Sequence, residues 1–435
     1  MREKQLGWGH IISISSVYPN PAEPGLGLFV RSRLLHMAAL AELVVVSPVA
    51  AIDYSNPERS WFRNLRLASH RKDLGVEVFH PKWIFPPGGT PINVLCLVLR
   101  LVATLIRLRA RRYRFGLIDA HFGYPEGVAA VLLGKIFRCP VAVTLRGSER
   151  RFASYRYRRV CLEWALRRAD AVFAVSEELR RFAVTAGADP ARTRTIPNGI
   201  DREVFHPRNR VACRKAYGMR DDHKVIVSAG ELIKAKGHHM VMRAVRDLLE
   251  EGHNVDLYVA GGVARGEAPF NEELGSVVRD GNLGRNVHMI GWINRERLAE
   301  LMCAADVFCL ASFTEGWPNV VNEALACGTP VVATRVGAVP EMLANKCHGI
   351  IVPPQDQAAL TDGLRRALLM DWNRETIARW GQSRCWEDVA RDVLAALQHL
   401  VPGWQPVKTG SDSASALIPN ASSSLANREK ASIKG

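Results

Sequence analysis

The feature that most constrains this chain is the alternation, along almost its whole length, of short β-branched runs with stretches of helical periodicity. Such alternation predicts strands joined by crossover helices, and therefore α/β units with parallel sheets. The expected strands are 11–14, 43–46, 76–79, 117–118, 141–144, 171–175, 225–229, 256–260, 287–290, 307–310, 330–333 and 349–352. The expected helices are 29–40, 93–111, 127–137, 159–168, 177–186, 238–251, 272–280, 295–304, 320–326 and 357–370, with Ser176 as the N-cap of the fifth.

The length of 435 residues predicts two domains, because a single core of that size is unusual. A turn-rich stretch from Ile196 to Pro207 separates two α/β series. We therefore expect an N-terminal domain over 1–207 and a C-terminal domain over 208–383. A last amphipathic helix, over 384–403, is expected to cross back to the first domain. The Ser-, Ala- and Asn-rich segment 408–435 is expected to be a disordered tail.

The cysteines and the N-terminus indicate a cytoplasmic protein. The nine cysteines show no CxxC spacing, which is typical of a reducing compartment. The short apolar run that begins at His10 stops at Pro19 and predicts a first strand rather than a signal peptide. No apolar stretch is long enough to span a bilayer.

The net charge of +15 is unevenly distributed. Between Pro91 and Arg168 there are 16 Arg or Lys residues against four acids. A basic face of this kind suits an anionic membrane surface, an anionic substrate or a nucleic acid, although solvated helix faces also explain it.

The strongest motif runs from Ser312 to Thr334 and reads SFTEGWPNVVNEALACGTPVVAT. A strand is expected to end before it, a Gly/Pro-containing loop carries Glu315, and a helix that opens near Asn319 carries Glu323. Backbone N–H groups at a helix start can hold a phosphate without side-chain charge. Carboxylates on either side can accept hydrogen bonds from sugar hydroxyls, which matches a sugar–diphosphate–ribose ligand.

This motif resembles the E-x7-E signature of glycosyltransferase family 4, which has the GT-B fold. The resemblance implies that Glu315 contacts the donor sugar and that Glu323 binds the ribose. It also implies that the backbone at Asn319 and Val320 holds the diphosphate, with Gly316 in the same donor-binding loop.

A second motif, GELIKAKG over 230–237, resembles the family's G-R-L-x-x-x-K-G. Lys236 matches the lysine that neutralises the donor diphosphate. Glu231 stands where the family has arginine, so its part in donor binding is in doubt. His238 and His239 follow directly, and we interpret them as helix surface or interdomain packing rather than as metal ligands.

Three residues of the first half complete the candidate site. Gly27 precedes an expected helix, and the resemblance places a glycine there under the donor diphosphate. His121 follows an expected strand, where related transferases have a histidine that faces the reacting sugar. Arg146 stands in TLRGSE, where the family has T-x-H-G-x-D, and it can clamp a phosphate through a bidentate contact. The interdomain turn PNGID, over 197–201, is expected to be structural.

The resemblance implies a GT-B protein, with two Rossmann-like domains facing across a cleft and a C-terminal helix that crosses back to the first domain. It implies a retaining, metal-independent hexosyltransferase that uses a UDP- or GDP-sugar and needs no cofactor. Glu315, His121 and Lys236 are the catalytic candidates. We expect no nucleic-acid partner and no metal site. The expected acceptor is lipid-linked or a polysaccharide intermediate of bacterial surface glycan synthesis.

The alternatives are a GT-B nucleotide-sugar epimerase and a basic membrane- or nucleic-acid-binding protein without catalysis. A dinucleotide dehydrogenase is disfavoured, because no G-x-G-x-x-G follows the first expected strand.

The segment 91–112 predicts an interfacial helix on the inner face of the cytoplasmic membrane, because arginines interrupt its apolar run. The alternative is a core helix whose arginines form its wet face.

Overall fold

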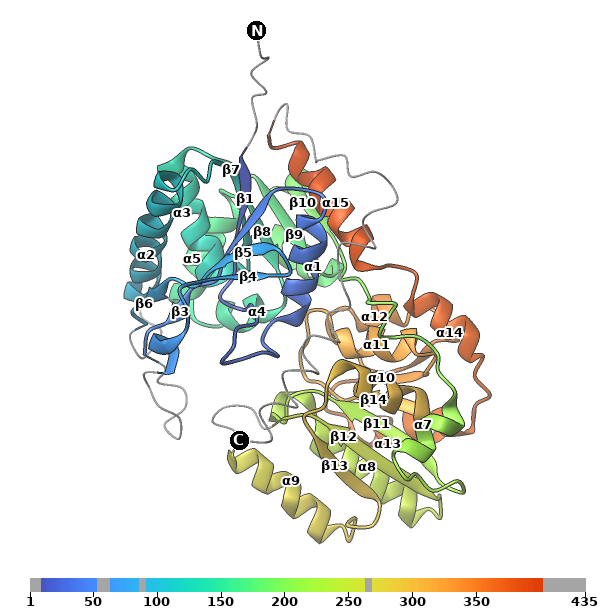
Figure 1. Cartoon of the computed structure of the whole chain (residues 1–435). Helices are drawn as coiled ribbons and strands as arrows, with labels where there is room; N and C mark the ends of the chain where they lie inside the picture. The colour runs from blue at the N-terminus through green and yellow to red at the C-terminus, as the bar shows by residue number, and fades with distance from the viewer. Residues whose placement is uncertain (1–8, 53–62, 86–90, 263–267, 402–435) are drawn as a thin grey trace. The chain divides into compact units, whose positions relative to one another are not determined.

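The structure is a computed structural model that describes residues 9–52, 63–85, 91–262 and 268–401 (Figure 1). The chain forms two compact units, each of which is described by itself. The first unit comprises the described residues up to Ala174, Arg180–Ile196 and those from Trp386 onward. The second comprises Val175–Leu179 and Pro197–Cys385. The expected tail over 408–435 lies outside the described residues.

The first unit is built on an eight-stranded sheet of order β10-β9-β8-β7-β1-β2-β5-β4. Its strands are β1 (His10–Ile14), β2 (Leu43–Val46), β4 (His70–Asp73), β5 (Val76–Phe79), β7 (Phe115–His121), β8 (Val141–Leu145), β9 (Ala171–Ala174) and β10 (Thr193–Thr195). All neighbouring strands pair in parallel except β4, which is antiparallel to β5 at the edge. A separate parallel pair joins β3 (Val49–Ala50) to β6 (Lys82–Trp83).

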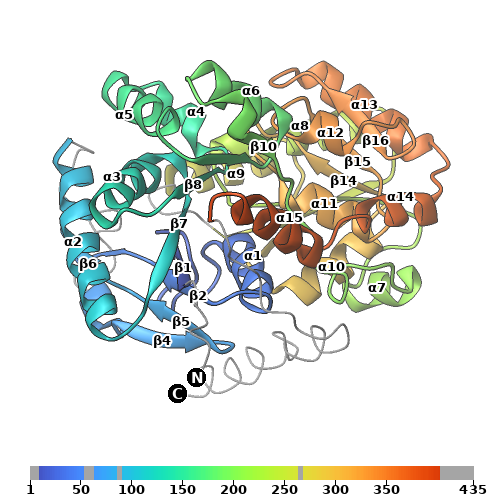
Figure 2. The same cartoon turned by 90° about the horizontal axis from the view of Figure 1, so that it is seen from above.

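Helices cover both faces of this sheet, as Figures 1 and 2 show. Ile12 and Ile14 of β1 pack with α2 (Pro91–Ala110), α3 (Val128–Phe137) and α5 (Arg156–Leu166). Ile11, on the other side of the same strand, packs with α1 (Leu28–Ala38) and α15 (Trp386–Gln398). Because both faces are covered, these strands are apolar almost throughout. The expected return of the last helix to the first unit is confirmed by this packing, with the helix beginning at Trp386.

The second unit has a six-stranded parallel sheet of order β13-β12-β11-β14-β15-β16. Its strands are β11 (Lys224–Ala229), β12 (Val255–Ala260), β13 (Val287–Gly291), β14 (Val307–Leu310), β15 (Val331–Thr334) and β16 (Gly349–Val352). Its helices are α7 (Arg210–Ala216), α8 (His238–Glu250), α9 (Ala268–Asp280), α10 (Arg295–Ala304), α11 (Asn319–Ala326), α12 (Val339–Met342), α13 (Gln357–Leu369) and α14 (Arg374–Gly381). One core lies against α10 and α11, and another against α8 and α13.

The expected strands and helices are present, with ends that move by a few residues. The expected parallel sheets are confirmed, and the edge strand β4, which was not expected, is the antiparallel exception, formed by a hairpin through Leu74 and Gly75. The short helix α4 (Ser148–Ala153) and the helices α7, α12 and α14 were not expected. The Ser176 N-cap of α6 (Glu177–Thr185) is confirmed, because the Leu179 N–H donates to Ser176 Oγ at 3.3 Å.

The compact units meet along the chain at Ile196 and Pro197, before the boundary expected at 207. None of the described helices is long and apolar enough to cross a membrane.

Candidate active site

In an open parallel sheet, ligands bind beyond the carboxyl ends of the strands. In the second unit, β11 leads at that edge into the turn that contains Lys236, and β14 leads into the loop that contains Glu315. Although these residues are 79 positions apart, Lys236 Nζ lies 2.6 Å from Glu315 Oε1. The same carboxylate oxygen accepts a hydrogen bond from Ser312 Oγ at 2.7 Å. Glu315 is therefore held in place by two donors from two neighbouring strand ends.

The loop that carries Glu315 is seated against the backbone that follows β15. Gly316 O accepts a hydrogen bond from the Ala338 N–H at 3.0 Å. Gly337 has a φ of +52°, and a Cβ on it would lie 2.6 Å from Glu315 O. Only glycine permits both this backbone conformation and this close approach.

Helix α11 begins at Asn319, with Val320 as its second residue. Asn198 Nδ2 donates to Asn319 Oδ1 at 3.0 Å, so the PNGID turn braces the start of this helix. The backbone N–H groups of its first turn are directed toward the carboxyl edge of the sheet, which is the geometry that suits an anion.

Glu323 lies four residues after Asn319 in α11 and is partly buried. Burial raises its pKa to about 7, while Arg295 opposes the shift and Asp201 adds to it. Arg295 and Asp201 form an ion pair at 2.9 Å. Glu323 thus changes its charge near neutral pH.

Two histidines beside Lys236 correct the sequence interpretation. His238 and His239 are buried inside the second unit, not on its surface. His238 Nδ1 lies 3.0 Å from Ser228 Oγ, and burial lowers its pKa to about 4. Both histidines therefore support the core beneath the site. Glu231, in contrast, is exposed in the loop between β11 and Lys236.

In the first unit, Gly27 caps α1 with a left-handed backbone of φ +67°. A Cβ on it would lie 2.4 Å from Val17 O. The glycine is required because the loop after β1 passes directly over the start of this helix.

His121 and Arg146 meet at the carboxyl ends of β7 and β8. Arg146 Nη2 donates to His121 Nδ1 at 2.9 Å, and His121 Nε2 donates to Asp119 Oδ2 at 3.2 Å. Burial lowers the pKa of His121 to about 4, so the ring is neutral and its tautomer is set by these two partners. Both ring nitrogens of His121 are therefore hydrogen-bonded to other side chains of the protein.

Asp119 also pairs with Arg33, at 3.4 Å, and Arg33 Nη1 donates to Thr144 Oγ1 at 2.9 Å. Burial opposes ionisation of Asp119, but Arg33 and His121 hold its pKa well below the usual range. The guanidinium of Arg146 stacks over Phe29 of α1, at 5.2 Å from the ring centre. The Arg146 side chain is therefore fixed by packing as well as by His121.

Two buried glutamates support the surrounding loops. Glu149 accepts hydrogen bonds from the N–H groups of Gly123, Arg146 and Gly147, which makes it a structural brace for the loop after β8. Glu126 Oε1 accepts from the Ser16 N–H at 3.2 Å, and burial raises the pKa of Glu126 to about 7.

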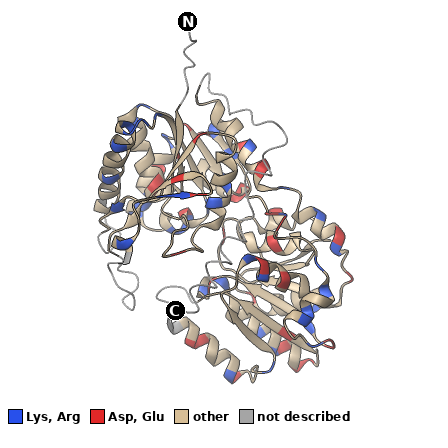
Figure 3. Cartoon of the chain, in the orientation of Figure 1, with Lys and Arg blue, Asp and Glu red and all other residues tan. Residues whose placement is uncertain are grey.

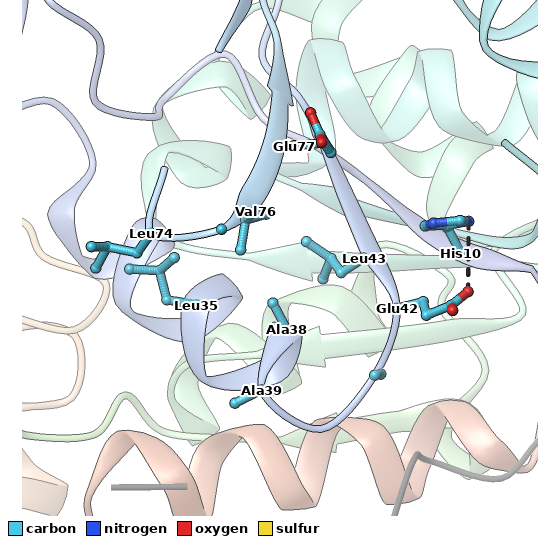
Figure 4. A pocket seen from close by; sticks show the side chains of 11 residues that line it. His10, Leu35, Ala38, Ala39, Glu42, Leu43, Leu74, Val76 and Glu77 are labelled. Atoms are coloured by element: carbon cyan, nitrogen blue, oxygen red, sulfur yellow. Dashed lines mark ion pairs between the residues drawn. The ribbon is translucent and has the colours of Figure 1, made fainter. Parts of the chain in front are cut away.

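A pocket of about 380 Å³ lies at the other end of the first sheet (Figure 4). It is lined by His10, Glu42, Leu43 and Val76, at the amino ends of β1, β2 and β5, and by Leu35 of α1. His10 and Glu42 face each other across 3.8 Å. Because His121 and Arg146 lie at the carboxyl ends, this pocket is not part of the candidate site.

Sequence reasoning missed Ser312, Asp119, Arg33 and Glu126. Ser312 stands inside the quoted motif, and its place three residues before Glu315 was the available signal. Arg33 and Glu126 act through contacts over 86 to 111 positions, for which the sequence offers no local signal, whereas Asp119 stands two residues before His121. Among the described residues, no group of three or more His, Cys, Asp or Glu side chains is arranged to hold a metal.

Known proteins resemble both halves of the chain. Residues 65–204 match the family described as glycosyltransferase family 4, and residues 210–384 match glycosyl transferases group 1. TuaC of Bacillus subtilis (strain 168), a glycosyltransferase named for teichuronic acid biosynthesis, is 26% identical over 401 residues, which cover 89% of this chain and 93% of TuaC. A D-inositol 3-phosphate glycosyltransferase of Kribbella flavida is 29% identical over 243 residues, 54% of this chain and 57% of the relative.

Solved structures show the same architecture. A sucrose-phosphate synthase from Thermosynechococcus elongatus has a TM-score of 0.72 at 21% identity, covering 90% of this chain and 99% of that one. Anabaena HepE, in complex with UDP and glucose, has a TM-score of 0.70 at 20% identity, covering 90% and 100%.

Two α/β units with parallel sheets, matched by these solved structures, define the GT-B fold. The chain belongs to the family 4 glycosyltransferases and is a transferase enzyme. The expected family, fold and enzyme class are thereby confirmed.

Proposed function

We propose that this enzyme transfers a hexose, with retention of anomeric configuration, from a UDP- or GDP-sugar to an acceptor of bacterial surface glycan synthesis. The observation that carries the proposal is the contact of Lys236 with Glu315 beside the start of α11. It joins a cation, a carboxylate and oriented N–H groups at one sheet edge. Such a set matches a diphosphate next to a sugar.

In this proposal the second unit holds the donor. Lys236 and the N–H groups at Asn319 and Val320 bind the diphosphate, Glu315 orients the sugar, and Glu323 accepts hydrogen bonds from the ribose. Gly316 keeps the loop seated, and Glu231 is directed away from the phosphates because its carboxylate and the diphosphate repel each other. The UDP bound by HepE supports a uridine nucleotide as the first donor to test.

The proposed reaction is a front-face displacement that requires no metal. The acceptor oxygen forms a bond to the anomeric carbon as the bond to the diphosphate breaks, and the departing diphosphate takes the acceptor's proton. Lys236 and the start of α11 stabilise the negative charge that develops on the leaving group. In the first unit, Gly27 holds the loop after β1, and His121 positions Arg146 for an anionic substrate group.

The acceptor is proposed to be lipid-linked, with the enzyme peripheral on the inner face of the cytoplasmic membrane. Helix α2 supports this. Its inner face packs into the core through Leu97, Leu101 and Leu105, whereas its outer face exposes Ile92, Leu95, Leu99 and Ile106. An exposed apolar stripe on a core helix is unusual for a monomer in water and suits a lipid boundary.

The charges around α2 point the same way (Figure 3). Of the four acids between Pro91 and Arg168, Asp119, Glu126 and Glu149 are buried, and Glu163 pairs with Arg167 at 3.4 Å. The exposed surface is therefore basic. Each basic residue near an anionic lipid adds about 1 kcal/mol to binding.

Not every arginine of α2 is available for lipid. Arg109 lies over the rings of Phe115 and Phe137, at 4.6 and 4.8 Å, and donates to Phe137 O. Although Arg109 is exposed, its guanidinium is held by these contacts. Arg107, Arg111 and Arg112 are exposed and are the residues to test.

The donor is tested by screening nucleotide sugars for protection against thermal unfolding. A ligand at 100 times its Kd adds about 2.7 kcal/mol to stability. Nucleotide release is then measured with and without acceptor preparations. Release that depends on an acceptor supports transfer, and interconversion of the sugar without release would indicate an epimerase instead.

Membrane docking is tested by sedimentation with liposomes of graded anionic content. The variant carries Arg107, Arg111 and Arg112 changed to Gln, and a second carries Leu95→Asn and Leu99→Asn. The matched control changes Val211 and Leu369 to Asn, because both are exposed apolar residues of the second unit. Loss of binding in the α2 variants alone supports docking there, and equal binding by all three variants would refute it.

A further inference from the structure

The segment 150–168, which includes most of α4 and all of α5, is both strongly basic and rich in aromatic residues. It contains seven arginines, four aromatic residues and a single acid, Glu163. Glu163 lies 4.0 Å from Arg159 and 3.4 Å from Arg167, so one carboxylate is shared by two guanidinium groups. This part of the first unit therefore keeps a large excess of positive charge.

Aromatic rings hold several of these arginines in place. The Arg158 guanidinium lies 4.6 Å from the ring centre of Tyr155 and 5.5 Å from that of Phe152. The Arg168 guanidinium lies 5.0 Å from the ring centre of Trp164. Cation–π contacts orient guanidinium groups without cancelling their charge, so these arginines remain attractive to an anion.

The exposed aromatic rings on this surface are tyrosines. Tyr155 has an exposed fraction of 57% and Tyr157 one of 39%. A tyrosine presents an apolar ring face, on which the apolar face of a sugar can rest, together with a polar hydroxyl group. Arginine forms paired hydrogen bonds with carboxylates and phosphates. The combination suits a hydrated chain of sugars that carries negative charges.

This surface differs from the exposed side of α2, on which the membrane proposal rests. The exposed side of α2 presents aliphatic side chains such as Leu95 and Leu99, whereas that of α5 presents tyrosine and arginine side chains. Helix α3 packs against both α2 and α5 and lies between them (Figure 2). Aliphatic groups suit a lipid boundary, and hydroxyl and guanidinium groups suit a hydrated polyanion.

The basic surface begins beside the candidate site of the first unit. Helix α4 starts two residues after Arg146. Tyr124 stands three residues after His121, and its ring centre lies 5.9 Å from the Arg158 guanidinium. A chain whose end enters the site can continue from there along α5, which has 11 residues and is therefore about 16 Å long.

We propose that α4 and α5 bind the anionic, already assembled part of the acceptor glycan, outside the site where the sugar is transferred. The proposal rests on the glycosyltransferase function proposed above and adds the chemical class of the acceptor, a glycan chain with carboxylate or phosphate groups. The arginines contact these groups, and Tyr155 packs against a sugar ring. Affinity increases with chain length, because further anionic groups of the same chain reach further arginines.

The test is fluorescence anisotropy of the full chain with end-labelled oligosaccharides, as trimers and as decamers. Oligogalacturonate supplies carboxylates, phosphomannan supplies phosphates, and maltooligosaccharides are neutral. We expect one of the anionic decamers to bind more tightly than its trimer and than the neutral decamer. A variant with Arg151, Arg156 and Arg159 changed to Gln is expected to bind that decamer about 10- to 100-fold more weakly, because three exposed charge contacts are lost.

A matched control separates this surface from net charge. It changes Arg243, Arg366 and Arg379, which are exposed arginines of the second unit, to Gln, and it is expected to keep wild-type affinity. Tyr155→Ala is expected to weaken the decamer by about 2- to 10-fold. Tyr155→Phe retains the ring and is expected to restore most of that loss. Thermal melts of each variant confirm folding.

Three results would overturn the proposal. Equal weakening in the surface variant and the matched control would mean that only net charge matters. Equal affinity for the neutral and anionic decamers would mean that the arginines do not select the ligand. A surface variant that loses binding to anionic liposomes or to poly(U) RNA, but keeps its affinity for the anionic decamers, would assign this surface to lipid or to RNA instead.

Titration with UDP and GDP distinguishes this inference from the proposed function. A wild-type protein that binds a nucleotide but neither anionic decamer overturns the glycan surface and leaves the donor assignment intact. A wild-type protein that binds an anionic decamer through these arginines but neither nucleotide overturns the donor assignment and leaves the surface intact.

Discussion

Lys236 Nζ and Glu315 Oε1 lie 2.6 Å apart, and Ser312 Oγ binds the same carboxylate oxygen at 2.7 Å. The cation proposed for the diphosphate is thus in contact with the carboxylate proposed for the sugar. Lys236 and Glu315 lie in the loops that follow two neighbouring strands, β11 and β14, which pair in parallel. The hydrogen bond between the two side chains holds both of them in position before a donor binds.

Replacing Glu315 is expected to lower turnover much more than nucleotide affinity. Glu315→Gln keeps the size of the side chain but removes the charge that Lys236 and Ser312 hold. We expect kcat to fall about 100-fold or more, the effect of removing one preorganised polar group from an active site, with the Kd for UDP changed by less than about 5-fold. Single-turnover kinetics and calorimetry measure the two quantities. Wild-type turnover in Glu315→Ala would remove this residue from the mechanism.

Lys236→Ala is expected to weaken UDP by about 10- to 150-fold, since hydrogen bonds to charged groups carry more binding energy than neutral ones. The control is Lys234→Ala, because Lys234 is an exposed lysine of the same short turn. Equal effects of the two substitutions would indicate general electrostatic attraction instead of a specific ligand. Calorimetry at two salt concentrations checks this distinction.

Glu126 and Glu323 are each expected to contribute stability that is lost as pH rises from about 4.5 to about 7, whereas the buried His121 and His238, whose pKa values are lowered to about 4, contribute stability that grows with pH between about 4 and 6.5. Burial raises the pKa of Glu126 and Glu323 from 4.5 to about 7, so between these values the folded state binds more protons than the unfolded state. Each group contributes a slope of at most about 1.4 kcal/mol per pH unit, and none outside that window.

Chemical unfolding at several pH values measures this slope. Each of Glu126→Gln and Glu323→Gln removes a contribution that falls with pH, so the slope of stability against pH is expected to become more positive in each variant. An unchanged slope in both variants would show that neither carboxyl is responsible.

Gly237→Ala is expected to destabilise the second unit by roughly 2–6 kcal/mol. Gly237 follows Lys236, has a φ of +71°, and a Cβ on it would lie 2.1 Å from Ala311 O, so backbone strain and overpacking add together. Gly252 is the matched control, with a φ of +86° and no atom within 4 Å of the added Cβ. Gly252→Ala is expected to cost only about 1–2 kcal/mol. Urea unfolding compares them, and similar losses would mean that the close approach is unimportant.

Transfer is expected to continue in excess EDTA, because Lys236 and the start of α11 provide the charge stabilisation that a metal would otherwise supply. The measurement is acceptor-dependent release of UDP before and after chelation. Complete loss that added Mg²⁺ or Mn²⁺ restores would contradict the proposed mechanism.

The sequence by itself determined the α/β class, because strand and helix periodicities are local patterns that can be recognised without knowing which segments pack together. It also determined the donor motif, since Glu315, Asn319 and Glu323 are close along the chain and the helix between them fixes their spacing.

Only the tertiary structure decided which distant groups meet. The pairing of β11 with β14 brings Lys236 to Glu315, and the pairing of β7 with β8 brings Arg146 to His121. It also buried His238, at the start of α8, and left Trp292, directly after β13, exposed. Burial and contact depend on which elements pack together, and that is set by the summed burial of apolar surface across the unit rather than by any one segment.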